Sequence, residues 1–198
     1  MLRPSLGKGI TGFSVIFLLL VTVLPSKGGA PVSVDEVELH ENKNAEGKEG
    51  ILATLRIPAS PAAVWRVLTD YNHLSEFIPD LLVSRVMGEK EGDILLYQQG
   101  KARLLFYVFR SSVTLRIQEE PHRKITFFKT SGDFDYFEGY WLLEPLEEGK
   151  ETALTYVLWA HPAFYVPHWL TEMMLKRDVP KRLFALKTRI ISQATAEP

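Results

Sequence analysis

The chain has 198 residues, of which 46% are hydrophobic, and this is enough apolar material for one globular domain with a substantial core. Its formal net charge is -1 and no basic run dominates, so the charge pattern does not indicate a nucleic-acid partner. The chain has no cysteine, which excludes disulfides, thiolate metal ligands and cysteine nucleophiles. The histidines show no metal-ligand spacing, and neither a Gly-x-Ser-x-Gly elbow nor a glycine-rich phosphate loop is present, so we expect no metal and no other cofactor.

Residues 1–30 have the pattern of a secretory signal peptide. Two basic residues, Arg3 and Lys8, precede an uncharged and mostly apolar run at 10–24, and small residues follow at 26 and 28–30. The alternative is an uncleaved membrane anchor, although such an anchor usually needs about 20 apolar residues. We therefore expect export, with a bacterial periplasm as the destination that suits a cysteine-free chain.

The folded part begins with two predicted strands. Residues 32–39 alternate between apolar and polar side chains, which is the pattern of a half-buried strand. Residues 51–57 repeat this pattern after a charged, glycine-containing loop at 41–50. We expect these two strands to pair as a hairpin.

Two short helices are predicted after this hairpin. Ser60 and Pro61 form a typical helix start, and the helix is expected to run to about Asp70. Asn72 is a candidate cap for a second helix at 73–77. A carboxylate at a helix C-terminus opposes the helix dipole, so Asp70 should have another partner. Asp70 either fixes the turn by a hydrogen bond or provides a polar group at the mouth of a cavity.

The middle of the chain contains strands only. Short turns separate the apolar or alternating runs, and this arrangement is typical of an antiparallel meander. One turn is predicted at 99–100, and the run at 104–109 is apolar on both faces, so it is a candidate contact with a membrane surface or a partner. The predicted strands are 81–87, 94–98, 102–109, 112–118, 125–129, 134–145 and 152–160.

Residues 168–192 are predicted to form one long amphipathic helix. Pro180 cannot donate a backbone hydrogen bond and crowds the preceding turn, so a kink or break is expected near residues 178–179. A helix this long needs a large apolar partner. The apolar face of its second half consists of Val179, Leu183, Leu186 and Ile190.

This order of elements predicts a two-layer α+β domain. An antiparallel sheet of about seven strands curls because each strand has a right-handed twist, and its concave face must be covered by the terminal helix. The two short helices, which follow the first strands, can close one end of the curved sheet.

Three parts of the sequence resemble one known superfamily. They are the first helix and its exit, the central strands, and the last strand, at 60–80, 132–145 and 152–167. These stretches are similar to the START-like (helix-grip) superfamily, and within it to the polyketide cyclase/dehydrase and coenzyme Q-binding branch. The resemblance covers roughly residues 32–193, so we assign 31–195 to one START-like domain. It implies a deep apolar cavity between sheet and helix that carries lipids, quinones or polyketides, with catalysis only in some members.

The residues that we expect to bind a ligand are mostly apolar or aromatic side chains on the inner face of the sheet and on the terminal helix. Ordinary core packing is the alternative for any single one of them, whereas the set as a whole has the composition of a ligand pocket. The candidates are Trp65, Phe77, Val113, Leu115, Ile117, Phe127, Phe137, Trp141, Leu143, Leu154, Tyr156, Leu158, Met173, Met174 and Leu183.

We expect the domain to bind, and possibly to transport, a hydrophobic small molecule such as a lipid or an isoprenoid quinone. The first alternative is an aromatase/cyclase acting on a polyketide, which would need polar groups with perturbed pKa values inside the cavity. The second is an interaction module with a filled core. The sequence does not indicate an oligomeric state.

Overall fold

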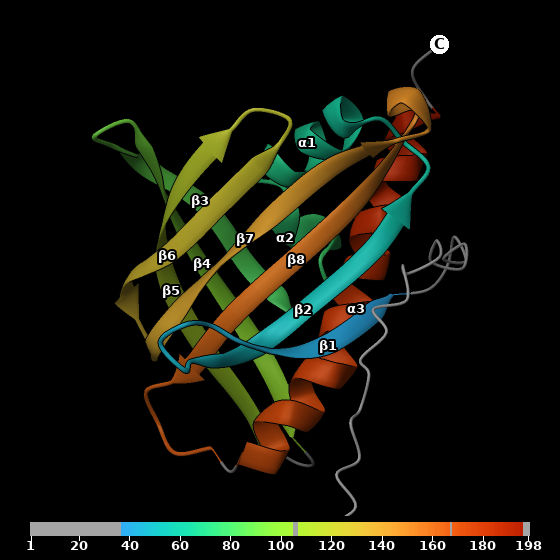
Figure 1. Ribbon diagram of the computed structural model, residues 1–198. Helices are drawn as coiled ribbons and strands as arrows, with labels where there is room; N and C mark the ends of the chain where they lie inside the picture. The colour runs from blue at the N-terminus through green and yellow to red at the C-terminus, as the bar shows by residue number, and fades with distance from the viewer. Residues whose placement is uncertain (1–36, 105–106, 167, 196–198) are drawn as a thin grey trace, which may run out of the picture. The chain divides into compact units, whose positions relative to one another are not determined.

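The computed structural model describes residues 37–104, 107–166 and 168–195 (Figure 1). The predicted signal peptide or anchor, and residues 32–36 of the first predicted strand, lie outside the described residues. In the described part of the chain, no helix is both long and apolar enough to cross a membrane.

In the described residues, eight strands and three α-helices follow one another in the expected order. The first hairpin and helices are β1 (Glu38–Lys43), β2 (Glu49–Ile57), α1 (Pro61–Thr69) and α2 (Leu74–Phe77). Five strands follow: β3 (Leu81–Lys90), β4 (Asp93–Leu104), β5 (Tyr107–Glu120), β6 (Lys124–Gly132) and β7 (Phe134–Leu146). A short 3-10 turn, η1 (Glu147–Gly149), leads to the last elements, β8 (Glu151–Pro162) and α3 (His168–Ala194).

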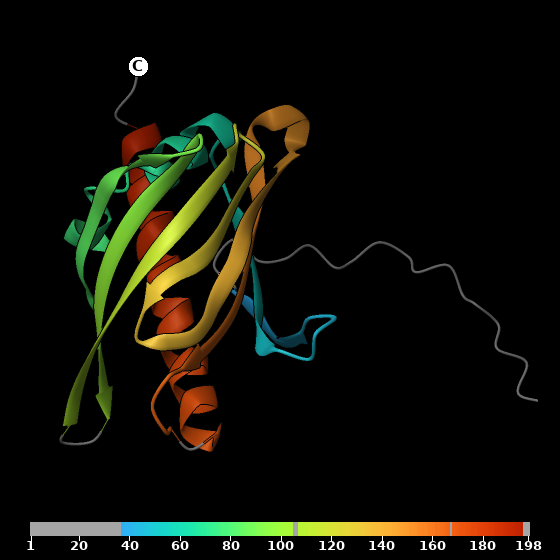
Figure 2. The ribbon, with the colours of Figure 1, turned by 90° about the vertical axis from the view of Figure 1, so that its left-hand side faces the viewer.

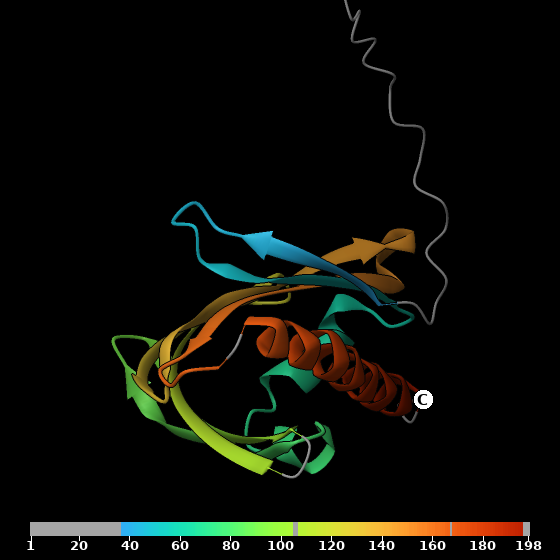
Figure 3. The ribbon, with the colours of Figure 1, turned by 90° about the horizontal axis from the view of Figure 1, so that it is seen from below.

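All eight strands belong to one antiparallel sheet with the order β1-β2-β8-β7-β6-β5-β4-β3. Strands β3 to β8 form a meander, and β2 closes the arrangement by pairing with β8, so that Ile51 lies opposite Leu158. The predicted hairpin of β1 and β2 is confirmed. The sheet curves around α3, which runs along its concave side (Figures 2 and 3). The predicted α+β class is therefore confirmed, with eight strands instead of about seven.

The turn predicted at residues 99–100 is wrong. β4 continues to Leu104, because Gly100 pairs with Leu81 of β3 on one side and with Ser111 of β5 on the other. Two neighbouring strands therefore hold this Gln-Gly pair extended, and the sheet contains two long strands, β4 and β5, where the sequence suggested three short ones. The predicted charged turn between β3 and β4 does occur, with positive φ at Glu91 and Gly92.

The start of α1 has the predicted cap. The Ser60 side chain accepts a hydrogen bond from the Ala63 backbone N–H at 3.3 Å, and Pro61 occupies the first turn. The cap predicted for α2 is wrong, since His73 holds the N-cap position without a side-chain hydrogen bond. Asn72 instead accepts a hydrogen bond at 2.9 Å from the backbone N–H of Val86, which ties the α1–α2 connection to β3.

Helix α3 continues through Pro180, so the predicted break does not occur. Its predicted apolar face is correct, because Val179, Leu183, Leu186 and Ile190 are all buried. These side chains share a core with α1 and β2, including the fully buried Val64 and Leu55. The tightest packing therefore lies under α1 and the C-terminal half of α3.

Gly139 lies in β7 where the backbone of β8 leaves no room for a side chain. A Cβ atom at this position would lie 2.0 Å from the backbone oxygen of Val157 and 2.8 Å from the Phe127 ring. A strand glycine at such a close approach has a structural role.

Candidate functional site

A cavity of about 690 Å³ lies between the concave face of the sheet and α3. Its walls come from β4 to β8, from the segment that runs from the end of α1 to the start of β3, and from the face of α3 that carries Val179, Leu183 and Leu186. This volume lies within the range of about 300–1,000 Å³ that small-molecule sites occupy. The sheet and the helix therefore do not fill the space between them.

Nine of the predicted ligand-binding residues line this cavity. They come from β5, β6, β7, β8 and α3, and their side chains share the concave face because side chains on one face of a strand recur at every second residue. They are Val113, Leu115, Ile117, Phe127, Phe137, Trp141, Tyr156, Leu158 and Leu183.

Five of the other predicted residues are not part of the described cavity lining. Leu143 and Leu154 face the correct side of the sheet, but they pair with each other at the end of β7 and β8 that α1 covers, and they are buried in the core. Met173 is 42% exposed on α3. The side chain of Met174 lies outside the described part of the structure.

Trp65 and Phe77 pack at the edges of the domain instead. The Trp65 ring meets His122 edge to face, with 5.8 Å between the ring centroids. The guanidinium of Arg189 lies over the Phe77 ring at 5.4 Å. Each aromatic ring therefore has a partner outside the cavity.

Aromatic rings form one wall of the cavity. Trp141 and Tyr156 stack with 4.1 Å between their centroids, and Phe127 stacks with Tyr156 at 6.2 Å. Phe137 joins this group through Phe127 at 6.0 Å. Rings that support one another in this way give a rigid and apolar surface.

Several lining residues were missed by the sequence analysis. The connection after α1 contributes Tyr71, Leu74, Ile78 and Leu81. Their contribution depends on how α2 folds back against β3, and no periodicity in so short a helix could indicate it. The Tyr71 hydroxyl donates a 2.6 Å hydrogen bond to Glu119, and burial is the main reason that the pKa of Tyr71 lies well above its ordinary value.

Asp70, the neighbour of Tyr71, does not line the cavity. Its carboxylate lies 2.5 Å from the His73 Nδ1 atom, at the exposed turn between α1 and α2. Of the two roles considered for Asp70, the structure therefore supports the one that fixes the turn.

One end of the cavity has an exposed apolar rim, which we define as Val108, Phe109, Phe164 and Tyr165. All four side chains are at least 42% exposed, and Tyr165 is 91% exposed. Phe109 of β5 stacks on Phe164, in the connection between β8 and α3, with 6.3 Å between the ring centroids. Phe109, Phe164 and Tyr165 also line the cavity, so the rim joins the interior to the surface.

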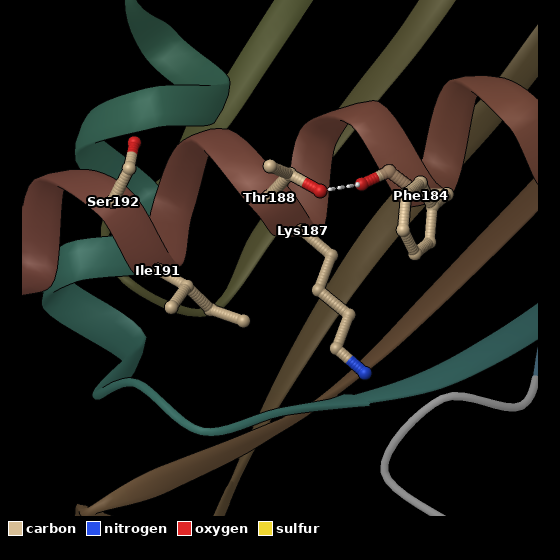
Figure 4. Close-up of a pocket in the computed structure, with 5 residues that line it drawn as sticks. All are labelled: Phe184, Lys187, Thr188, Ile191 and Ser192. Carbon is tan, nitrogen blue, oxygen red and sulfur yellow. Dashed lines mark hydrogen bonds between the residues drawn. The ribbon is translucent and has the colours of Figure 1, made fainter.

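A second, smaller pocket of about 320 Å³ lies on another face of α3 (Figure 4). Its described lining is Phe184, Lys187, Thr188, Ile191 and Ser192, all from this one helix. Thr188 donates a hydrogen bond to the Phe184 backbone oxygen at 2.9 Å. The interior cavity, to which several elements contribute, is the stronger candidate site.

Among the described residues, no group of three or more histidine or acidic side chains is arranged to hold a metal ion. The polar groups of the cavity are instead scattered among apolar ones. Gln98 donates to the Ser84 hydroxyl at 3.2 Å, and Lys101 lies 3.8 Å from the Asp80 carboxylate.

A curved sheet that holds a long helix above an apolar cavity is the architecture of START-like proteins. Three solved structures share this fold. A START superfamily protein from Mycobacterium smegmatis has 14% identity and a TM-score of 0.63, over 73% of this chain and 98% of that one. A STAR-related lipid transfer protein from Xanthomonas axonopodis has 18% identity and a TM-score of 0.59, with coverages of 82% and 96%. The Zhui aromatase/cyclase from Streptomyces has 14% identity and a TM-score of 0.58, with coverages of 78% and 94%.

The family model "Polyketide cyclase / dehydrase and lipid transport" matches residues 57–187. The chain therefore belongs to this family, within the START-like superfamily, and the predicted resemblance is confirmed. The search of curated proteins gave no match.

Proposed function

We propose that the domain binds a hydrophobic small molecule, a lipid or an isoprenoid quinone, in the cavity between the sheet and α3, and that it carries this molecule. The observation that supports this most directly is the cavity of about 690 Å³ with its aromatic and aliphatic walls. An apolar surface of this kind gains on the order of 25 cal/mol for each Å² that a ligand removes from water. Transfer of the apolar part of the ligand from water or membrane is therefore the driving force.

The rim is the proposed route for ligand exchange. It connects the cavity with the surface through two aromatic rings, Phe109 and Phe164, that stack on each other. Exposed apolar side chains around an opening suit contact with a lipid surface. We propose that the rim meets a membrane when the ligand enters or leaves.

The first experiment asks whether the purified domain holds a ligand. Native mass spectrometry and solvent extraction should find a lipid or a quinone in the wild-type protein. In Ala160→Phe, the new ring enters the cavity, because Ala160 lines it, and ligand occupancy should fall several-fold.

Ala153→Phe is the matched control. It lies on the same strand, β8, but an odd number of positions away and so on the opposite face. Its occupancy should remain that of the wild type. Proteins that are empty in all three forms, and that take up neither lipids nor quinones when these are added, would contradict the proposal.

A cyclase that acts on a polyketide is the second candidate. Tyr156 and Arg182, two polar side chains in the cavity lining, favour it because a cyclase needs groups that polarise a carbonyl or stabilise an enolate. Turnover of a poly-β-ketone that Tyr156→Phe abolishes would establish this activity, whereas unchanged recovery of the substrate would exclude it.

We further propose that the protein is exported to a bacterial periplasm through residues 1–30, on the basis of the charged, apolar and small-residue pattern of this segment. Mass spectrometry of the protein recovered from the periplasmic fraction tests this. A mature N-terminus near residue 30 agrees with cleavage, and an intact chain in the membrane fraction identifies an anchor.

A further inference from the structure

Arg182 differs from the other charged residues of the cavity lining. The charged side chains among the described lining residues are Lys101, Asp178 and Arg182. Lys101 has Asp80 as its partner, and both oxygens of Asp178 are held by Arg177, at 2.6 and 2.9 Å. Arg182 has no hydrogen bond and no ion pair among the described residues, and its Nε atom is buried without an acceptor.

The nearest candidate counter-ion along the helix does not change this. Asp178 precedes Arg182 by one helical turn and lines the same cavity, but its carboxylate already forms a bidentate pair with the Arg177 guanidinium. Arg177, Asp178 and Arg182 together carry one net positive charge. Since Arg177 and Asp178 neutralise each other, the remaining charge is that of Arg182, which lines the cavity.

Tyr156 supplies a second polar group without a protein partner. Its hydroxyl makes no hydrogen bond among the described residues, although its ring stacks with Trp141 and with Phe127. Burial raises the pKa of Tyr156 to about 12, and the charge of Arg182 opposes this rise, so the two groups are near enough to interact. At neutral pH the hydroxyl keeps its proton and can donate it in a hydrogen bond.

The Arg182 side chain is half-buried and its Nε atom is fully buried. Partial burial of a guanidinium without a counter-ion is unfavourable, because no protein group replaces the hydration that is lost. Arginine also has the geometry that binds carboxylate and phosphate groups through two parallel hydrogen bonds. We infer that Arg182, which lines the same cavity as Tyr156, binds an oxyanion on the ligand, so that the ligand is an amphiphile with an apolar body and a carboxylate or phosphate head. This inference rests on the proposed function, since it assigns the polar end of the molecule that the cavity holds.

The test uses three probes with the same alkyl chain: laurate, dodecyl phosphate and dodecanol. Binding is measured by calorimetry at a pH at which laurate is ionised. The wild type should bind one or both anions at least about tenfold more tightly than dodecanol, which is the size expected of one charge-assisted hydrogen bond. The anion that binds more tightly identifies the head group as carboxylate or phosphate.

Arg182→Gln should remove the preference for the anions, because the charge-assisted hydrogen bond to the head group is lost. It should leave dodecanol binding within about twofold of the wild type, because a neutral alcohol gains little from the guanidinium charge. Lys181→Gln is the matched control, since it removes the same charge from the neighbouring, exposed position of α3 and should keep the preference. Arg182→Lys should keep part of it, because it retains the charge without the planar fork.

The outcomes separate the two proposals. Equal binding of the three probes by the wild type would overturn the oxyanion site and leave hydrophobic ligand binding intact. A preference that persists in Arg182→Gln would also overturn it. Failure of all three probes to bind, dodecanol included, would instead contradict the proposed function.

Stability provides a second and independent measurement. Arg182→Met keeps most of the aliphatic volume but removes the unpaired charge, so the melting temperature of the ligand-free protein should rise. A purely structural role for Arg182 predicts a fall instead, and a fall would overturn the inference.

Discussion

His73 and Asp70 show how a local ion pair affects a titrating side chain. The hydrogen bond that His73 donates to Asp70, and then the charge of Asp70, raise the pKa of His73 above the ordinary value. A histidine with a raised pKa stabilises the folded state fully at pH values below its unfolded pKa of about 6.5. This contribution is lost as the pH rises through the folded pKa. The pair is exposed, so its effect on stability is small.

Asp70→Asn should lower the pKa of His73 toward about 6.5, the value of an unperturbed histidine. An NMR titration of the His73 ring protons measures this directly. Asp135→Asn removes a carboxylate elsewhere and serves as the control, with no expected change at His73. An unaltered His73 titration in Asp70→Asn would show that the pair does not persist in solution.

At this scale the sequence could identify residue types but not their partners. Asp70 was expected to have a partner, and it does, because a carboxylate at a helix C-terminus is unfavourable without one. The isolation of Arg182 could not be predicted. It arises because Asp178 pairs with its direct neighbour, Arg177, and not with Arg182, which lies one turn later.

The strands illustrate what periodicity can and cannot predict. Alternation placed Trp141 and Leu143 on the same inner face of β7, and both do face inward. It could not show where along the strand the cavity ends and the core covered by α1 begins. Leu143 and Leu154 were therefore predicted to line the cavity, whereas they lie in the core. Position across a strand is a local property, whereas position along it depends on the packing of another element.

Gly139→Ala tests the close approach in β7. The added Cβ would lie 2.0 Å from the Val157 backbone oxygen, so the backbone must shift. We expect a loss of at least about 1–3 kcal/mol in the free energy of unfolding, the usual cost of overpacking. Urea denaturation followed by circular dichroism measures it.

Gly100→Ala is the control for a glycine in a strand. Its Cβ would meet only the Asp80 backbone oxygen, at an ordinary 3.5 Å. The free energy of unfolding should stay within about 0.5 kcal/mol of the wild type. Equal effects of the two substitutions would mean that close approach is not the reason for Gly139.

At the scale of the whole molecule, the order of the elements was sufficient to predict a sheet that wraps around a terminal helix. It was not sufficient to predict the rim, because Phe109 and Phe164 come from segments that lie far apart in the sequence and meet only in the folded domain. The doubly apolar run at 104–109 predicted a contact with a membrane surface or a partner, and this stays a prediction.

Val108→Glu tests the proposed role of the rim. Val108 is 57% exposed and is not part of the cavity lining, so the affinity for a ligand should change little. A charge at the rim weakens contact with a lipid surface, so the rate of ligand transfer between vesicles should fall several-fold. Fluorescence transfer assays give both quantities.

Met87→Glu introduces the same charge at a similarly exposed position, 54%, near the opposite end of β3 and β4. Its transfer rate should equal that of the wild type. If both substitutions slow transfer equally, general repulsion from the membrane explains the effect and the rim has no special part in it.

The pairing of β2 with β8 also determines when the domain can fold. Strand β2 pairs with β1 early in the chain, but its second partner, β8, becomes available only when almost the whole domain has been synthesised, and α3 follows later still. Contacts between such distant parts of a chain form slowly, because a long loop must close before they are gained. We therefore expect the sheet to close late in synthesis.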